Sequence, residues 1–115
     1  MFERNAIIMS TLHHQKLVDE ILLAVGSMPT VRLWTRPVGF DQSRNIKYGI
    51  KGEADLQGII APRGRALAIE CKTGNAVLSK EQKLWRAMFE KFGGLYILAR
   101  DVNQVVECIR RNSDG

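Results

Sequence analysis

The chain has 115 residues, of which 45% are hydrophobic and 25% are charged, and its formal net charge is +5. This length and composition fit one folded globular domain, and they exclude a low-complexity or disordered chain. The basic balance favours an anionic partner, nucleic acid first, although a positive charge can also serve solubility alone.

Cysteine use and the first residues bear on the compartment. Cys71 and Cys108 stand far apart and form neither a disulfide framework nor a zinc-ligand spacing, so a reducing, cytoplasmic setting is expected. The apolar patch Ala6-Ile7-Ile8-Met9 is too short for a signal peptide or a membrane span. No membrane association is therefore expected.

Helices are predicted where apolar side chains recur every three or four residues, and strands where short apolar runs lie between turn residues. The predicted elements are, in chain order, a helix over about 11–25, strands over 31–36, 55–60 and 66–71, a helix opened by the capping box 79–82 and ended by 93–94, a strand over 95–99 and a helix reaching about 111. Residues 37–51 are expected to be irregular. The chain is thus predicted to form one α/β domain over 1–115, with the order α-β-β-β-α-β-α, a mixed sheet flanked by helices, and peripheral ends at 1–10 and 112–115.

Charged residues end one of the predicted strands. Glu70 and Lys72 project from the same face, because side chains of a strand alternate, and burying them costs free energy unless they are paired or hold a metal. A turn of three or four residues centred on 62–64 would place Asp55 opposite Glu70 or Cys71, with Cβ atoms roughly 4.5 to 5.5 Å apart. A register slip of one residue would turn one acid away.

Two neighbouring carboxylates and a lysine suit the hydrolysis of a phosphodiester. Mg²⁺ or Mn²⁺ held by Asp55, Glu70 and the backbone carbonyl of Cys71 would neutralise the phosphate charge and lower the pKa of a bound water. Lys72 would then orient the attacking water or stabilise the charged phosphorane. The alternative is that Glu70 and Lys72 form a solvated ion pair on an exposed face and that Asp55 is a turn residue.

The chain also resembles a known family through three motifs. These are Gly52-Glu53-Ala54-Asp55, Ile69-Glu70-Cys71-Lys72 and Ser79-Lys80-Glu81-Gln82. In this order and spacing they are similar to the virus-type replication-repair nuclease domain (VRR-NUC) of the PD-(D/E)xK phosphodiesterases, over residues 11–105. The resemblance implies a restriction-endonuclease-like core, an Mg²⁺- or Mn²⁺-dependent nuclease, and the catalytic set Asp55, Glu70 and Lys72, with Gln82 matching a glutamine that the family carries.

The resemblance also implies a partner. Stand-alone copies of this domain resemble small phage and bacterial proteins that dimerise and cut branched DNA, including four-way (Holliday) junctions, and larger relatives act in DNA repair. The family commonly has a further acid on the first helix. This chain departs from the family here: the candidate is Glu20, another alignment would place His13 near that position, and the alternative for Glu20 is an exposed pair with Lys16.

The irregular segment is predicted to contact DNA, because basic groups bind phosphates and aromatic rings stack on unpaired bases. The predicted DNA-binding residues are Arg36, Arg44, Lys47, Tyr48, Lys51, Lys80 and Lys83. The leading hypothesis is a homodimeric endonuclease for branched DNA in a bacterial cell or a phage-infected host. The alternatives are a non-catalytic basic nucleic-acid-binding protein and a sequence-specific restriction-type enzyme, for whose recognition subdomain the chain leaves little room.

Overall fold

The computed structural model describes residues 2–36 and 39–113, and within them the side chains of residues 8–36, 42–45 and 49–113. Its elements are α1 (Phe2–Gly26), β1 (Val31–Thr35), β2 (Gly39–Asp41), β3 (Ile46–Tyr48), β4 (Leu56–Ile60), β5 (Arg65–Cys71), α2 (Lys80–Lys91), β6 (Leu95–Ala99) and α3 (Val102–Asn112). Every predicted element is present, so the α/β class and the order α-β-β-β-α-β-α are confirmed.

The main sheet is mixed and has the strand order β1-β4-β5-β6. β4 pairs antiparallel with both β1 and β5, whereas β6 runs parallel to β5. Ile60 faces Arg65 across a four-residue turn over 61–64, and the same register pairs Leu56 with Ile69. The turn therefore has the length that the sequence predicts, and it fixes which residues meet at the far end of the hairpin.

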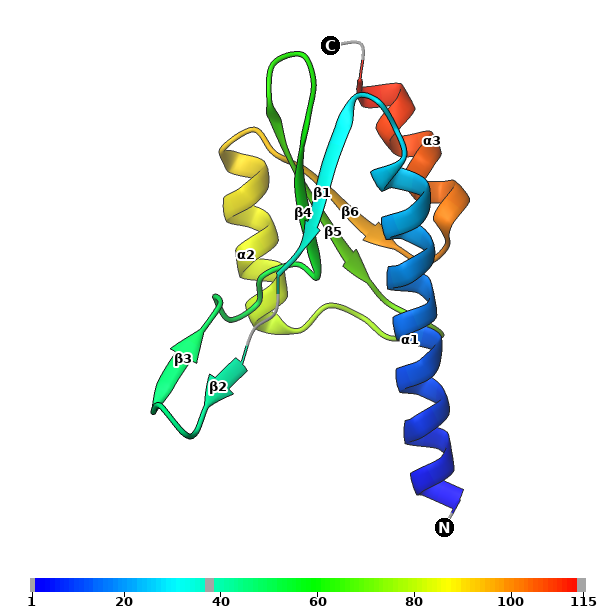
Figure 1. Cartoon of the computed structure of the whole chain (residues 1–115), viewed down its shortest axis with the longest axis vertical. Helices are drawn as coiled ribbons and strands as arrows, with labels where there is room; N and C mark the ends of the chain where they lie inside the picture. The colour runs from blue at the N-terminus through cyan, green and yellow to red at the C-terminus, as the bar shows by residue number, and fades with distance from the viewer. Residues whose placement is uncertain (1, 37–38, 114–115) are drawn as a thin grey trace.

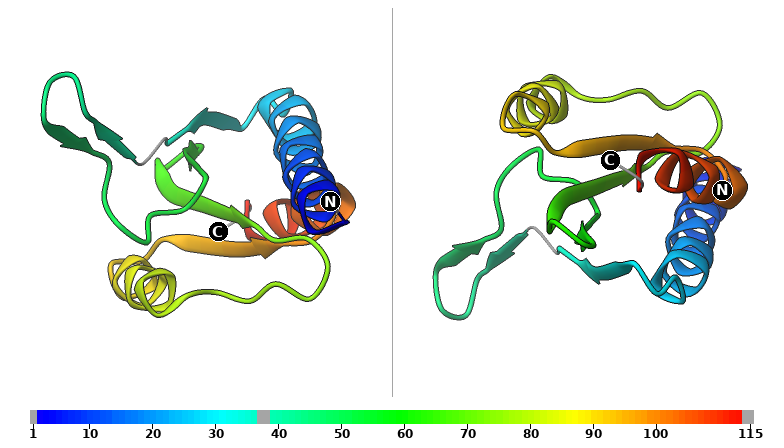
Figure 2. Two further views of the ribbon diagram at one scale, coloured as in Figure 1. Left: turned by 90° about the horizontal axis from the view of Figure 1, so that it is seen from below. Right: turned by 90° about the horizontal axis from the view of Figure 1, so that it is seen from above.

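Helices cover both faces of this sheet. α1 and α3 lie together on one face and α2 lies on the other (Figure 2). The larger core fills the space under α1 and α3, with Ile21, Leu56 and Ile69 fully buried. A smaller core of Ala68, Trp85 and their neighbours lies under α2. Alternate residues of β5 thus serve different cores, as the period of a strand requires.

The first helix is longer than predicted. α1 begins at Phe2, not near residue 11, and has 25 residues, so its first turns extend past the sheet (Figure 1). The apolar residues before position 11 lack helical periodicity, which is why the pattern failed to mark them. No helix in the described part of the chain combines the length and the apolar character that crossing a bilayer requires.

The segment 37–51 was predicted to be irregular, and this prediction is wrong in part. β2 and β3 form a separate antiparallel hairpin that stands out from the body beyond the end of β1 (Figure 1). Asn45 completes its turn with φ of 54°, a left-handed conformation that asparagine tolerates. Each strand has only three residues, too few for a readable alternation.

Candidate active site

Two carboxylates meet where β4 begins and β5 ends. Asp55 directly precedes β4, and one further step of the antiparallel register brings it level with Glu70. The Asp55 amide donates to Glu70 Oε1 at 3.2 Å, and the Cys71 amide donates to Asp55 Oδ2 at 2.9 Å. The hairpin thus brings the two acids together, and of the two partners that the sequence left open for Asp55, Glu70 or Cys71, the register selects Glu70.

Glu70 is the more deeply buried acid of this pair. Its exposed fraction is 3%. Burial, followed by the charge of Asp55, raises the pKa of Glu70 from its ordinary value of 4.5 to about 7, while the Lys72 ammonium acts against this rise. Lys72 Nζ lies 3.8 Å from Glu70 Oε2, and 19% of the lysine side chain is exposed. The lysine can therefore interact with a bound anion while it remains next to the acid.

Gln82 links the start of α2 to Glu70. Its side-chain Oε1 accepts from the backbone N–H of Ser79, and its backbone N–H donates to Ser79 Oγ. These two hydrogen bonds complete the predicted capping box. The Nε2 of the same side chain donates to Glu70 Oε2 at 3.1 Å. One glutamine therefore fixes the helix and orients the carboxylate.

The wall opposite Glu70 is the loop before β4, which is held by the buried Glu53. This carboxylate accepts from Arg36 Nε at 2.7 Å, from Gln57 Nε2 at 2.6 Å and from the Ile50 amide at 2.9 Å. Burial would raise the pKa of Glu53, but these hydrogen bonds and the Arg36 charge together lower it. Arg36, predicted to bind DNA, thus also anchors this loop.

Loop and helix enclose a cleft of about 330 Å³. It is lined by Arg36, Lys51, Gly52, Glu53, Asp55, Glu70, Ser79, Glu81 and Gln82. Gly52 has a φ of 85°, and a methyl group there would overlap the Glu81 carbonyl group, so only glycine allows the loop to lie this close to α2. The cleft combines carboxylates with cations, as an anionic substrate and a metal ion together require.

Replacing Glu53 by glutamine is expected to lower the free energy of unfolding by about 2 kcal/mol, because an amide cannot accept from all three donors at once. Urea unfolding at pH 7 measures this change. Glu107→Gln, on the exposed side of α3, is the matched control and should shift stability by less than about 0.5 kcal/mol. Equal stability of both variants would contradict the anchoring role of Glu53.

The first helix contributes a residue that the sequence reasoning missed. His14 Nε2 lies 3.3 Å from Asp55 Oδ2, and both side chains are partly exposed. His14 stands three and four residues before the core residues Leu17 and Val18, so it belongs to the face of α1 that packs on the sheet. This spacing is the signal that could have identified it.

The two residues proposed for the first-helix position lie elsewhere. Glu20 is exposed and pairs with Lys16 at 3.8 Å, which is the alternative that the sequence left open. His13 lines a shallow pocket of about 230 Å³ together with Glu20 and Arg100. Among the described residues, the structure brings neither Glu20 nor His13 to Asp55 or Glu70.

The predicted DNA-binding residues lie on different elements, and two of them, Arg36 and Lys51, line the cleft. Lys51 lies on its wall, paired with Glu81 at 3.5 Å. Lys80 and Lys83 are exposed on the first turns of α2, and Arg44 is exposed at the tip of the β2–β3 hairpin. Lys47 and Tyr48 belong to β3, but their side chains lie outside the described part of the chain.

The donor set was tested for its fit to a divalent cation. No group of three or more His, Cys, Asp and Glu in the described ranges is arranged as a metal cluster. Mg²⁺ and Mn²⁺ nevertheless need few protein ligands, and the like charges of Asp55 and Glu70 are what such a cation would neutralise. Burial raises the pKa of the Cys71 thiol to about 12, so this residue would offer its carbonyl and not a thiolate. The residues fit the ion.

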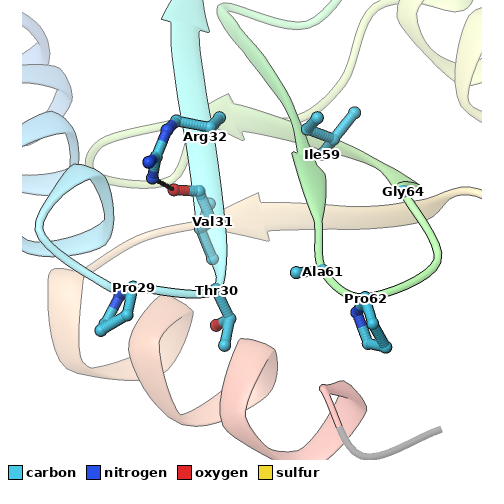
Figure 3. A pocket seen from close by; sticks show the side chains of 8 residues that line it. All are labelled: Pro29, Thr30, Val31, Arg32, Ile59, Ala61, Pro62 and Gly64. Atoms are coloured by element: carbon cyan, nitrogen blue, oxygen red, sulfur yellow. Dashed lines mark hydrogen bonds between the residues drawn. The ribbon is translucent and has the colours of Figure 1, made fainter.

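A further cavity of about 310 Å³ lies at the opposite end of the sheet, between the start of β1 and the β4–β5 turn (Figure 3). Arg32 is the one ionisable side chain among its lining residues, and it donates to the Val31 carbonyl at 3.0 Å. No carboxylate lines this cavity, whereas Asp55 and Glu70 both line the cleft at the other end of the sheet.

Comparison of the chain with family models, with curated proteins and with solved structures found no match. The resemblance to the VRR-NUC domain therefore stays a prediction based on three motifs. What the structure adds is the fold order and the geometry of Asp55, Glu70, Lys72 and Gln82.

Proposed function

We propose that this protein is a divalent-metal-dependent endonuclease that hydrolyses phosphodiester bonds in branched DNA. The observation that carries the proposal is the juxtaposition of Asp55 with the buried Glu70, which has Lys72 beside it, in a cleft that Arg36 and Lys51 also line. A buried acid whose pKa is raised by a second acid is an unfavourable arrangement for stability alone, and such arrangements concentrate at functional sites. The fold order expected from the VRR-NUC resemblance supports the same reading.

The roles follow from the positions of the side chains. Asp55, Glu70 and the Cys71 carbonyl would hold Mg²⁺ or Mn²⁺, which supplies Lewis acidity toward the phosphate and a bound water of lowered pKa. Lys72 stabilises the negative charge that develops on the phosphate oxygens as water adds to phosphorus and the bond to the leaving oxygen breaks. Gln82 keeps Glu70 in a fixed orientation by donating to Oε2.

The DNA would reach this cleft between two projecting elements. The β2–β3 hairpin and the first turns of α1 both extend from the body near the end of the sheet where the site lies (Figure 1). The exposed Lys51, Lys80 and Lys83 lie on or beside the cleft, where they can neutralise phosphates. A substrate with bent or open arms fits a site flanked by projections better than a straight duplex does.

We further propose that the acting form is a homodimer. Each chain has one candidate site, and cutting two strands of a branched substrate calls for two sites, which a symmetric pair of chains supplies. α2 and its C-cap leave three apolar side chains exposed at four-residue intervals, Leu84, Met88 and Phe92. An uncovered apolar stripe on a helix is a surface of the kind that pairs copies of a chain. Sedimentation of the protein at micromolar concentration measures this state.

One assay tests the nuclease proposal. Labelled four-way junction, flap and linear duplex are incubated with the protein in Mg²⁺, in Mn²⁺ or in EDTA. We expect cleavage of the branched substrates that requires the metal. Binding to all three substrates without cleavage in either metal would favour the non-catalytic nucleic-acid-binding protein instead.

Gln82→Glu separates the two tasks of this glutamine. Glutamate preserves the capping box, but it replaces the donor to Glu70 by a second negative charge, so cleavage at pH 7 is expected to fall about 10–100-fold. Steady-state cleavage rates and urea unfolding measure the two effects.

Ser79→Ala is the matched control for the cap. It removes the hydroxyl that accepts from Gln82 but keeps the Gln82–Glu70 hydrogen bond, so it should cost about 1 kcal/mol of stability and little activity. The orienting role is contradicted if both variants lose the same fraction of activity.

A further inference from the structure

The side chain of His14 has no part in the catalytic set assigned above, yet it contacts that set directly. His14 Nε2 lies 3.3 Å from Asp55 Oδ2. An ionised carboxylate only accepts hydrogen bonds, so Nε2 carries the hydrogen in this contact. The Cys71 amide donates to the same oxygen at 2.9 Å. Two donors from different elements, α1 and β5, therefore converge on one oxygen of Asp55.

This double anchoring leaves the other oxygen of Asp55 available. The hydrogen bonds from His14 and from the Cys71 amide both reach Oδ2, and Asp55 faces the Glu70 side chain in the cleft that both residues line. Two hydrogen bonds to one oxygen restrict the rotation of a carboxylate and so fix the direction in which its other oxygen points. Partners of this kind orient a ligand and set how tightly a cation is held.

The position of His14 is fixed by the packing of α1 on the sheet. Because α1 begins at Phe2, His14 lies well inside the helix and not in its fraying first turn. The next residues on the same face, Leu17 and Ile21, are buried in the larger core. The imidazole is thus carried on a rigid, packed element to the edge of the cleft.

We propose that His14 is a positioning residue that holds Oδ2 of Asp55 and so presents Oδ1 to a divalent cation in the cleft. The proposal rests on the proposed nuclease function for the identity of the cation. Its geometric core, the orientation of Asp55 by His14 and the Cys71 amide, is independent of cleavage and can be measured in the metal-free protein.

The test compares His14→Ala with His14→Gln. Glutamine keeps an N–H donor at a similar reach but is a poor substitute for a ligating imidazole. Mn²⁺ binding is followed by electron paramagnetic resonance of the free ion. We expect His14→Ala to weaken Mn²⁺ binding about 10–100-fold, and His14→Gln to stay within about 3-fold of the original protein.

Two further readouts complete the test. In the metal-free protein, the ¹H–¹⁵N resonance of the Cys71 amide should shift in His14→Ala and return toward its original position in His14→Gln. In the cleavage assay, His14→Ala should lower kcat and leave KM for DNA nearly unchanged. Gln15→Ala, whose side chain bonds the exposed Asp19, is the control on the same helix and should change none of these quantities.

Distinct results overturn the proposal. Unchanged Mn²⁺ affinity and an unchanged Cys71 resonance in His14→Ala would show that His14 does not position Asp55. Equal loss of Mn²⁺ affinity in both variants would show that the imidazole binds the cation itself. If the original protein cleaves no DNA but the Cys71 resonance still responds as expected, the nuclease function fails and the positioning of Asp55 stands.

Discussion

Replacing Glu70 by glutamine should reduce metal-dependent cleavage of branched DNA by about 10³-fold or more. The substitution preserves the size of a side chain that is almost completely buried, so the fold should persist. It removes the charge that, with Asp55, would hold the cation, and losing one preorganised electrostatic group already costs about 10²–10³-fold. Lys72→Ala should cause a loss of similar size, because it removes the cation that faces the developing phosphate charge. Initial rates on a labelled four-way junction measure both effects.

DNA affinity distinguishes a catalytic loss from a binding loss. Glu70 lines the cleft and Lys72 lies 3.8 Å from its carboxylate with only 19% of its side chain exposed, whereas Lys80 and Lys83 are exposed on the first turns of α2, where they can meet phosphates. Glu70→Gln should therefore bind the junction in Ca²⁺ within about 3-fold of the original protein, with the same dependence on salt. Lys83→Ala, the comparison variant, should weaken binding and reduce the salt slope by about one. A loss of affinity in Glu70→Gln as large as its loss of rate would contradict the assignment.

The pairing of Asp55 with Glu70 could be predicted because it depends on counting. A turn of three or four residues, two runs of apolar residues and the two-residue period of a strand place Asp55 opposite Glu70 or Cys71, and the observed register selects Glu70. The capping box was equally legible, since Ser79 and Gln82 act over three residues of one chain segment. Rules of this kind relate residues within one hairpin or one helical turn, so they predict contacts within such segments and not between distant ones.

His14 lay beyond that range. Its contact with Asp55 joins residues 41 positions apart, and it depends on how α1 crosses the sheet and on where that helix begins. The sequence motif pointed to an acid at Glu20, but position 20 lies off the face that Leu17, Val18 and Ile21 bury. Helical spacing from the core would have led to His14, whereas matching by residue type did not. Which residue of α1 contacts Asp55 is therefore set by the face of the helix on which it lies and not by its residue type.

The β2–β3 hairpin escaped prediction for a different reason. In the described part of the chain its strands pair with each other and not with the main sheet, and each has only three residues, so no alternation of apolar and polar residues can be read from them. The same segment was nevertheless predicted to contact DNA from its mixture of basic and aromatic residues. The composition of this segment thus suggests a role for it, although its sequence has no alternation of apolar and polar residues from which its strands could be predicted.

Between about pH 4.5 and pH 7, Glu70 should make the metal-free protein progressively less stable. Burial and the charge of Asp55 raise the pKa of Glu70 to about 7 in the folded protein, against 4.5 as its ordinary value. Below pH 4.5 both the folded and the unfolded chain keep the proton, so Glu70 adds no pH dependence. Between 4.5 and 7 only the folded state keeps it, and stability falls by at most about 1.4 kcal/mol per pH unit. Above 7 the fall stops, after a total of at most about 3 kcal/mol.

Glu70→Gln should remove this slope, because an amide does not titrate. The difference in unfolding free energy between the original protein and Glu70→Gln, measured by urea at several pH values in EDTA, isolates the contribution of Glu70 from that of other acids such as Glu53. The slope is the readout, since the amide also alters the hydrogen bonds to Asp55 and Gln82 by an amount that does not depend on pH. Glu107→Gln, exposed on α3, should leave the slope unchanged.

Adding Mn²⁺ at pH 8 should reverse the penalty in the original protein alone. A cation that binds only the folded state stabilises it by about 2.7 kcal/mol at one hundred times its dissociation constant, and it does so here by neutralising the charges of Asp55 and Glu70. Glu70→Gln should gain little from the same addition, because one of the two charges is gone. Equal stabilisation of both proteins by Mn²⁺ would place the cation elsewhere in the molecule. A pH-independent difference between them would mean that Glu70 titrates near its ordinary pKa, and the strained acid pair on which the proposed chemistry depends would then be absent.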